Sequence, residues 1–156
     1  MKLRSINVSY RQVAVFRAAL HNPFNDWTLA HFAQGFSWRP GSVSFATLQE
    51  CGPIDIEVVR STYSMADRAA ARSIAVPFEV DASGSVEVAS IGDGVALRIP
   101  AGSYRLVFEH GVVQDGKMWC RLWFEPTHDA NCEAVVLKAD EALHPSLPLL
   151  MEADPA

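Results

Sequence analysis

Cysteine is scarce in this chain, and its few copies are not arranged for a disulfide or metal-bound framework. The 156 residues include three cysteines, Cys51, Cys120 and Cys132, which are widely separated and form no C-x-x-C pair. A disulfide framework needs an even set of cysteines, and a structural zinc site needs closely paired ligands. We therefore expect neither. Isolated cysteines of this kind favour a reducing compartment, so we expect a cytoplasmic protein.

Excess positive charge and long apolar runs are also missing. The chain has 13 Lys and Arg against 18 Asp and Glu, which gives a formal net charge of −5. Such a chain does not attract a phosphate backbone by bulk charge, so we expect no direct nucleic-acid binding, whereas a basic protein partner is compatible. No apolar run approaches the roughly 18 residues that span a bilayer. Polar residues interrupt positions 1–16, so we expect neither a membrane segment nor a signal peptide.

The usual sequence signatures of catalysis are absent as well. The chain has no H-x-x-x-H or H-E-x-x-H pair, no G-x-S-x-G elbow and no G-x-G-x-x-G loop, so we expect no metal, no cofactor and no catalytic residues. The most catalytic-looking local feature is His128–Asp129 in PTHDANC, although loops often carry such residues for turn chemistry alone. A hydrolase built on these two residues and a nucleophile supplied by the fold is the weakest of three functional hypotheses.

The chain does contain a strong alternation of apolar and polar residues. In the segment 117–125, Met118, Cys120, Leu122 and Phe124 occupy every second position. Alternation of this kind places one face of a β-strand in a core and the other towards solvent. The pattern predicts an all-β fold, an antiparallel β-sandwich with one or two short helices. The other alternating or apolar segments are 5–10, 41–48, 53–60, 73–80, 94–99, 103–110 and 133–139.

Glycine and aspartate mark turns between these segments. DASGS, residues 81–85, predicts a hairpin between the strands on either side of it. IGDGV at 91–95 and QDGK at 114–117 predict two further tight turns. In the first segment, Ile6, Val8 and Tyr10 are expected to point to the same buried face.

No linker, repeat or low-complexity block divides the chain. We expect a single domain over residues 1–143 and a proline-rich tail over residues 144–156 that lies on the surface. Pro77 interrupts a strand pattern and cannot donate a ladder hydrogen bond, so its strand is expected at a sheet edge or with a bulge. An exposed edge would permit a homodimer.

Residues 25–38, NDWTLAHFAQGFSW, break the alternation with a dense group of aromatic side chains. Asn25 or Asp26 can cap the start of a helix, and Gly35 can end it in a left-handed conformation. The segment therefore predicts one or two helical turns that plug the core. His31 shares a face with the aromatic residues, and we interpret it as a packed histidine rather than a ligand.

Acidic side chains fall mainly on the polar faces of the predicted strands or at turns. A solvated face explains this pattern without any function, and a negative surface that docks on a basic partner is the functional alternative. As contributors to such a surface we select Asp26, Glu79, Glu87, Asp93 and Glu109.

Trp119, Arg121 and Trp123 occupy the face of their strand opposite the apolar residues. The first explanation is a strand that is packed on both faces. A recognition surface is the second, because Trp and Arg are common hot-spot residues, and we add these three to the predicted partner-binding set. An alternative function is a β-sandwich that binds a small molecule or carbohydrate through aromatic residues, with Trp38, Trp119 and Trp123 as candidates.

An ordered set of short segments resembles the DNA-entry nuclease inhibitor family, also called competence protein J. The set matches in order and spacing over about residues 5–108, and consists of SYRQVAVF (9–16), DWT (26–28), GF (35–36), VSF (43–45), VPFEV (76–80), SI (90–91) and IPAGSYRL (99–106). The resemblance implies a non-enzymatic, immunity-type inhibitor that binds and blocks a DNA-degrading nuclease associated with DNA uptake. It implies no residue roles, because the matched positions are mostly framework.

Overall fold

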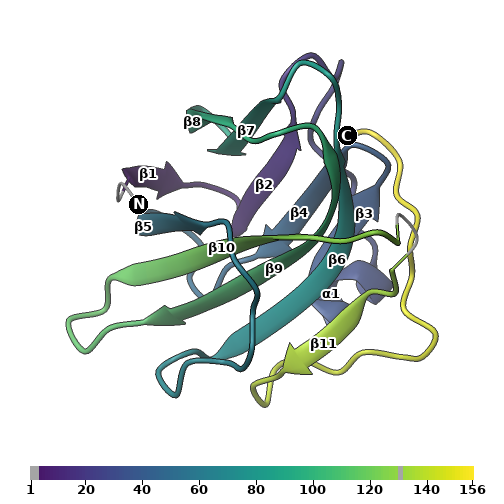
Figure 1. Cartoon of the computed structure of the whole chain (residues 1–156). Coiled ribbons are helices and arrows are strands. Elements are labelled where there is room, and N and C mark those ends of the chain that lie inside the picture. Colours follow the sequence, from purple (N-terminus) through teal and green to yellow (C-terminus); the bar gives the residue numbers. More distant parts are fainter. Residues whose placement is uncertain (1–3, 130–131) are drawn as a thin grey trace.

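The computed structural model describes residues 4–129 and 132–156 (Figure 1). Within these ranges the chain forms eleven strands and one short helix, in agreement with the predicted all-β class. In chain order the elements are β1 (Arg4–Val8), β2 (Gln12–Arg17), α1 (Leu29–Gln34), β3 (Phe36–Arg39), β4 (Ser42–Ala46), β5 (Gly52–Val59), β6 (Arg72–Val80), β7 (Ser85–Ser90), β8 (Asp93–Arg98), β9 (Gly102–Val112), β10 (Met118–Pro126) and β11 (Val135–Lys138).

The strands form two facing sheets, so the predicted sandwich is confirmed. The larger sheet has the order β1-β5-β10-β9-β6-β11 and the smaller sheet the order β3-β4-β2-β7-β8. All strand pairs are antiparallel except β5 with β10, which run parallel. Figure 1 shows β2, β4 and β3 behind β10, β9 and β6. The two sheets meet in one core, where Phe45 of β4 stacks on Phe108 of β9 with ring centroids 4.4 Å apart.

The alternation in the sequence gives the correct inward faces for most strands. On β10, Met118, Cys120, Leu122 and Phe124 are all buried in the core. The prediction for Tyr10 is wrong, because this residue is 74% exposed and has a φ of 54° in the turn between β1 and β2. The chain reverses there and passes from the larger sheet to the smaller one, so the period of two cannot continue through it.

Two of the three predicted turns join neighbouring strands. The turn at 91–92 connects β7 with β8, and the turn at 114–117 connects β9 with β10. The predicted hairpin at 81–85 is wrong. The chain does turn there, but β6 and β7 belong to different sheets, so the turn carries the chain across the sandwich instead of closing a ladder. Turn residues indicate that the chain reverses locally, but they do not indicate which sheet the next strand joins.

The helix α1 begins and ends with clear capping groups. Its N-cap is Thr28, not Asn25 or Asp26, because Thr28 Oγ1 accepts the backbone N–H of His31. The backbone N–H of Thr28 donates to His31 Nδ1 at 2.9 Å, which completes a capping box. Gly35 ends the helix with a φ of 85°, as predicted.

The segment 144–156, which we call the C-terminal strap, runs along the side of the sandwich past α1 (Figure 1, yellow). His31 Nε2 donates to the backbone oxygen of Glu152 at 2.9 Å, so this histidine is packed and hydrogen-bonded on both ring nitrogens, as expected. The buried Gln34 side chain accepts the N–H of Leu150 and donates to its carbonyl oxygen, both at 2.9 Å. The strap is therefore fixed to the helix by side chains of α1.

Pro77 lies on β6, which is placed between β9 and β11 and is therefore not the edge strand that its proline predicted. The edge strand β11 pairs only with residues 73–75 of β6, so no described strand covers the part of β6 that contains Pro77. Its carbonyl oxygen accepts the indole N–H of Trp38 at 2.8 Å instead. In the described part of the chain, no helix combines the length and apolar character required to cross a membrane.

Candidate partner-binding surfaces

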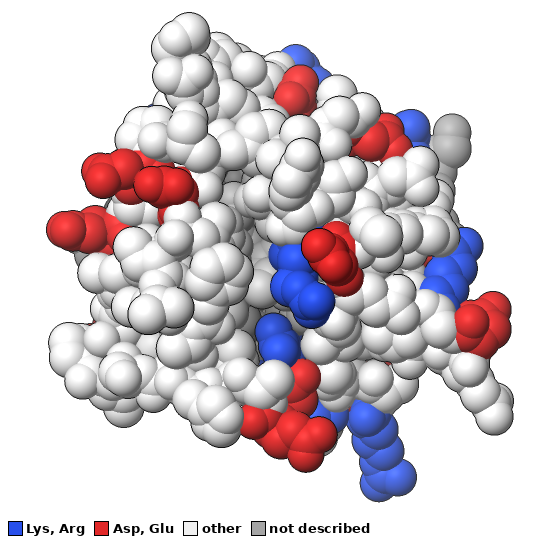
Figure 2. All heavy atoms as spheres, turned by 180° about the vertical axis from the view of Figure 1, so that it is seen from behind, with Lys and Arg blue, Asp and Glu red and all other residues white. Residues whose placement is uncertain are grey.

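The structure distributes the eight predicted partner-binding residues over separate surfaces and does not gather them into one patch. Glu109, Trp119, Arg121 and Trp123 lie on the outer face of the larger sheet, Glu87 and Asp93 on the smaller sheet, Asp26 beside the C-terminal strap, and Glu79 near the end of β6. Figure 2, which views the molecule from the side of the smaller sheet, shows acidic and basic groups interspersed over that face. This face therefore does not present one continuous acidic surface to a partner.

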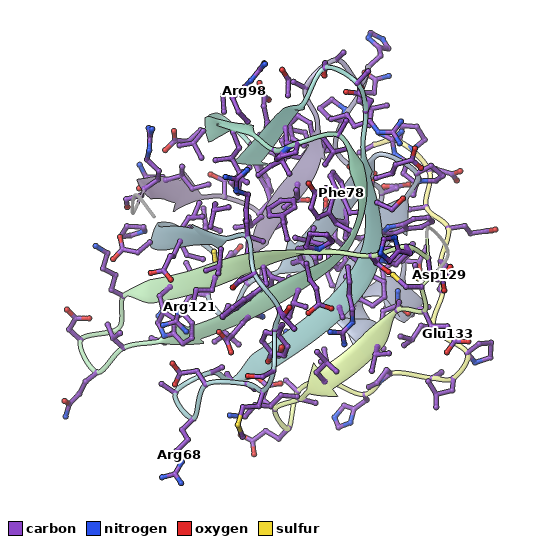
Figure 3. The ribbon with its side chains drawn as sticks, in the orientation of Figure 1. Arg68, Phe78, Arg98, Arg121, Asp129 and Glu133 are labelled. Carbon is purple, nitrogen blue, oxygen red and sulfur yellow. The ribbon has the colours of Figure 1, made fainter. Side chains whose placement is uncertain are left out.

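Arg121 is the centre of the group on the larger sheet (Figure 3). Its Nη1 lies 3.0 Å from Glu109 Oε1 and 3.2 Å from Asp67 Oδ2, and its Nε lies 3.4 Å from Glu57 Oε1. The guanidinium also stacks over the Trp119 ring at 4.9 Å from its centroid. Burial opposes the charged form, but the hydrogen bonds that Arg121 donates to Asp67 and Glu109 outweigh it and raise the pKa of Arg121. One cation is thus held by three carboxylates and a ring.

Glu109 differs from the other predicted acidic residues because its side chain is only 1% exposed. Besides Arg121, it accepts the backbone N–H of Asp67 at 2.7 Å and the indole N–H of Trp123 at 3.4 Å. A buried carboxylate must be paired and hydrogen-bonded to remain charged, and these donors provide that. Glu109 therefore organises the residues around it, and its charge is already engaged within the molecule.

The loop between β5 and β6 covers part of this face. Tyr63 packs edge-on against Trp123 with ring centroids 5.4 Å apart, and its hydroxyl lies 2.9 Å from Ser73 Oγ. Asp67 comes from the same loop. Its pKa is lowered, first by the backbone N–H of Ala69 and then by Arg121. Trp119, Arg121 and Trp123 are consequently half-buried. Sequence reasoning missed Tyr63 and Asp67, because an irregular loop has no periodicity that indicates where its side chains point.

Glu87 and Asp93 lie at one depression on the outer face of the smaller sheet, which we call the β7 hollow. It has a volume of about 470 Å³ and is lined by Phe16, Phe24, Glu87, Ala89, Ser90, Gly92, Asp93, Gly94, Val95 and Ala96. Phe16 and Phe24 form its aromatic wall, with ring centroids 5.7 Å apart in an edge arrangement. Both predicted acidic residues line this depression, but only Glu87 projects from the outer face beside Phe16, whereas the Asp93 carboxylate accepts the N–H of Asn7 on β1 of the other sheet. The aromatic wall is a feature that the sequence pattern did not reveal.

Asp26 lies at a second depression, formed with the C-terminal strap. This depression has a volume of about 360 Å³, and Glu152 and Asp154 lie on its strap side. All three carboxylate residues are exposed, and the backbone N–H of Asp26 donates to the carbonyl oxygen of Asp154 at 2.8 Å. Glu79 is also exposed, and its backbone oxygen accepts a hydrogen bond from Arg17 Nε at 3.1 Å.

The tryptophans of the alternative hypothesis do not share one cleft. Trp38 lies on β3 of the smaller sheet, beside a largely apolar cavity of about 460 Å³ that includes Pro77 and strap residues such as Leu149. Trp119 and Trp123 lie on the outer face of the larger sheet. Binding of a small ligand by all three together is therefore not supported by their positions.

The residues of the catalytic hypothesis lie at the surface. His128 and Asp129 are both exposed just after β10, and the segment that contains them, PTHDANC, continues into positions 130–131, outside the described residues. Over residues 4–129 and 132–156, no group of three or more His, Cys, Asp and Glu side chains is placed to hold a metal ion.

Comparisons with known proteins place the chain among competence proteins. The family model described as Competence protein J (ComJ) matches residues 5–139, so the family pattern continues beyond the end of the resemblance noted at residue 108. Among curated proteins none matches the chain. The crystal structure of ComJ from Bacillus subtilis, described as an inhibitor of the DNA-degrading activity of NucA, superposes with a TM-score of 0.69 at 20% identity, covering 81% of this chain and 96% of that one. A protein described as crocagin biosynthetic gene J superposes with a TM-score of 0.47 at 15% identity, covering 79% of this chain and 98% of that one.

Proposed function

The chain belongs to the competence protein J family, and from this premise we propose that it is a non-enzymatic inhibitor that binds a DNA-degrading nuclease and blocks it. The observation that carries the proposal is the family match over residues 5–139. The solved ComJ from Bacillus subtilis is described as an inhibitor of the DNA-degrading activity of NucA, and its fold covers most of this chain. An immunity-type role follows, in which the protein neutralises a nuclease by contact.

Charge supports a mechanism in which the inhibitor covers the DNA-binding cleft of the nuclease. A nuclease that binds DNA needs a basic surface to attract the phosphate backbone. The inhibitor carries a net charge of −5, which gives it the complementary sign. Complementary charge speeds the encounter, and an inhibitor seated on the basic surface excludes DNA without needing any chemistry of its own. We propose that the inhibitor contacts the nuclease and not the DNA.

The size of a protein interface limits how many of the candidate surfaces can take part. The accessible surface of the whole chain is 8037 Å². A standard interface buries about 800 Å² on each partner, which is roughly a tenth of that total. The Arg121 group and the β7 hollow lie on the outer faces of opposite sheets, so one nuclease molecule cannot cover both with an interface of that size. The inhibitory surface is therefore expected to be one of them, with its immediate surroundings.

The test is a titration of a nuclease with the purified protein. The nuclease encoded beside the gene for this chain is the natural choice, and cleavage of linear DNA is the readout. A stoichiometric inhibitor reduces cleavage linearly and abolishes it near one inhibitor per nuclease. Pre-mixing the inhibitor with DNA alone should leave the DNA unbound in a mobility-shift assay. Undiminished cleavage at a large molar excess, together with no complex in a pull-down, would refute the proposal.

Two finer points extend the proposal. We place the inhibitor in the cytoplasm, because a chain with three unpaired cysteines is suited to a reducing compartment. No described strand pairs with the part of β6 beyond Ala75 on its β11 side, so a second copy of the chain could add a strand there. Light scattering of the purified protein at several concentrations measures whether such a homodimer forms.

A further inference from the structure

The β7 hollow has the shape and charge of a socket for a single basic side chain. We propose that it receives a lysine or arginine side chain of the nuclease, and that this contact is the anchor of the inhibitory interface. The inference rests on the proposed function, and it adds the location of the surface and the chemistry of the group that the surface recognises. Its basis is the alignment of three strands on the outer face of the smaller sheet.

Two rows of side chains cross β2, β7 and β8 at this place. In the first row Phe16, Glu87 and Ala96 lie directly opposite one another, because Glu87 pairs with Phe16 on one side and with Ala96 on the other. Directly opposed residues of antiparallel strands project from the same face with Cβ atoms about 5 Å apart. The carboxylate of Glu87 therefore stands between an aromatic ring and a methyl group.

The second row forms the floor of the hollow. It consists of Ala14, Ala89 and Gly94, which pair in the same way across the three strands. The floor is flat because these are the smallest side chains available. It is also closely packed, since a Cβ atom added at Gly94 would lie 2.7 Å from the Cβ of Ala89 and 3.1 Å from the carbonyl oxygen of Val88. The depression therefore results from the small side chains at these three positions.

The carboxylate of Glu87 is available to an incoming cation. Within the described ranges it forms no hydrogen bond and no ion pair, although it is only half-exposed. Asp93 also lines the hollow, but it pairs with Ser90, and its Oδ2 accepts the backbone N–H of Asn7 on β1 of the larger sheet at 2.8 Å, so its carboxylate is turned away from Glu87. Two basic residues project from the same face, namely Arg98, whose Nη1 donates to Ser85 Oγ at 3.0 Å, and Arg39 of β3, whose Nε donates to Asn25 Oδ1 at 2.7 Å. The hollow therefore combines the carboxylate of Glu87 with an apolar wall.

This combination matches the two parts of a lysine or arginine side chain. The methylene stem can lie along Phe16 and Phe24 while the charged head reaches Glu87, which is how long basic side chains divide between apolar and polar surroundings. The other candidate surfaces match less well. The carboxylates around Arg121 already hold a cation of this chain. The depression at Asp26, Glu152 and Asp154 has no phenylalanine, tyrosine or tryptophan among its described lining residues.

Two charge-reversal variants with the same net charge distinguish a specific contact at Glu87 from a general effect of net charge on binding. Glu87→Lys and Glu141→Lys both change the net charge from −5 to −3, and Glu141 is an exposed residue in a turn before the C-terminal strap. Both variants should slow association equally through long-range charge. Only Glu87→Lys places a cation in the socket, so we expect it to weaken nuclease binding roughly 30-fold more than Glu141→Lys, as for a hot-spot residue.

A neutral variant tests the shape of the hollow. Ala96→Phe fills it from an exposed position of β8 without changing the charge, and an aromatic residue is well suited to a strand. We expect a loss of affinity of roughly 10-fold or more, measured by calorimetry and by inhibition of DNA cleavage. Circular dichroism of each variant establishes that the fold is retained.

The outcomes distinguish this inference from the proposed function. If the wild type inhibits the nuclease and Glu87→Lys weakens binding no more than Glu141→Lys, the socket is refuted and the inhibitor function stands. The socket can also be tested without a nuclease, by an NMR titration with arginine amide. Saturable shifts of backbone amides around Glu87 and Gly94 that are lost in Glu87→Gln would support it. Equal shifts in both proteins, or none, would refute it.

Discussion

Replacing Arg121 with methionine tests whether the buried carboxylate of Glu109 depends on its cation. Methionine keeps an unbranched, apolar stem over Trp119 while it removes the charge. The salt bridges of Arg121 to Glu57 and Asp67 involve carboxylate side chains that are 42% and 39% exposed, so solvent screens both and they contribute little to stability. Most of the effect must therefore come from Glu109.

The expected loss of stability follows from the burial of Glu109. Removing one partner of a buried ion pair destabilises a protein by about 3–5 kcal/mol. Glu109 keeps the N–H of Asp67 at 2.7 Å and the indole of Trp123 at 3.4 Å, and the Arg121 side chain is 30% exposed, so water can reach part of the gap. We therefore expect the lower end of that range, about 3 kcal/mol.

Urea unfolding followed by circular dichroism measures this loss, with Lys117→Met as the matched control. Lys117, in the turn before β10, pairs with Asp55 at 3.0 Å, and the two side chains are 42% and 26% exposed, so its replacement should cost less than about 1 kcal/mol. In a double-mutant cycle with Glu109→Gln, the double variant should lose about 2 kcal/mol less stability than the sum of the losses of the two single variants. Equal destabilisation by Arg121→Met and Lys117→Met would refute the reasoning.

Two further predictions concern a buried histidine and the C-terminal strap. Burial, and then Arg72, lower the pKa of His110 to about 3, so between that pH and about 6.5 the unfolded chain binds a proton that the folded protein does not. The free energy of unfolding should fall as the pH drops through this window, by up to about 1.4 kcal/mol per pH unit, which corresponds to one bound proton. The His110→Gln variant should lack this contribution in urea titrations from pH 7 to pH 5. Identical slopes would contradict this. Gln34→Leu leaves the N–H and carbonyl oxygen of Leu150 without their partner, so we expect a loss of about 2 kcal/mol and faster hydrogen exchange at Leu150; unchanged protection there would show that the strap is held by other contacts.

Several features of this protein follow from the sequence alone. Period-two alternation identifies most of the strands and their buried faces, because the geometry of an extended chain is local, although the strands at 12–17 and 36–39 lie outside the alternating segments. Gly35 ends the helix, and Pro77 lies in the part of β6 that β11 does not pair with, since each residue imposes its own backbone restriction. The ordered segments that resemble competence protein J also identify the family, which matches residues 5–139.

The helix cap and the turn at 81–85 show where local signals are insufficient. Asn25 and Asp26 are good capping residues, yet Thr28 is the cap, and Asn25 instead donates to the carbonyl oxygens of Ser37 and Ser42. The turn after β6 has the composition of a hairpin but leads into the other sheet. In both places several local solutions are available, and packing against distant segments selects one of them.

The candidate site depends on tertiary structure for the same reason. Glu87 and Glu109 both sit on alternating strands, yet one is available in a hollow and the other is buried beneath a loop. The difference arises because β2 lies beside β7, which brings Phe16 opposite Glu87, and because residue 67 folds back over β9 and β10. Sequence periodicity specifies the face on which a side chain lies, whereas the strand order and the path of the loops determine which side chains it meets there.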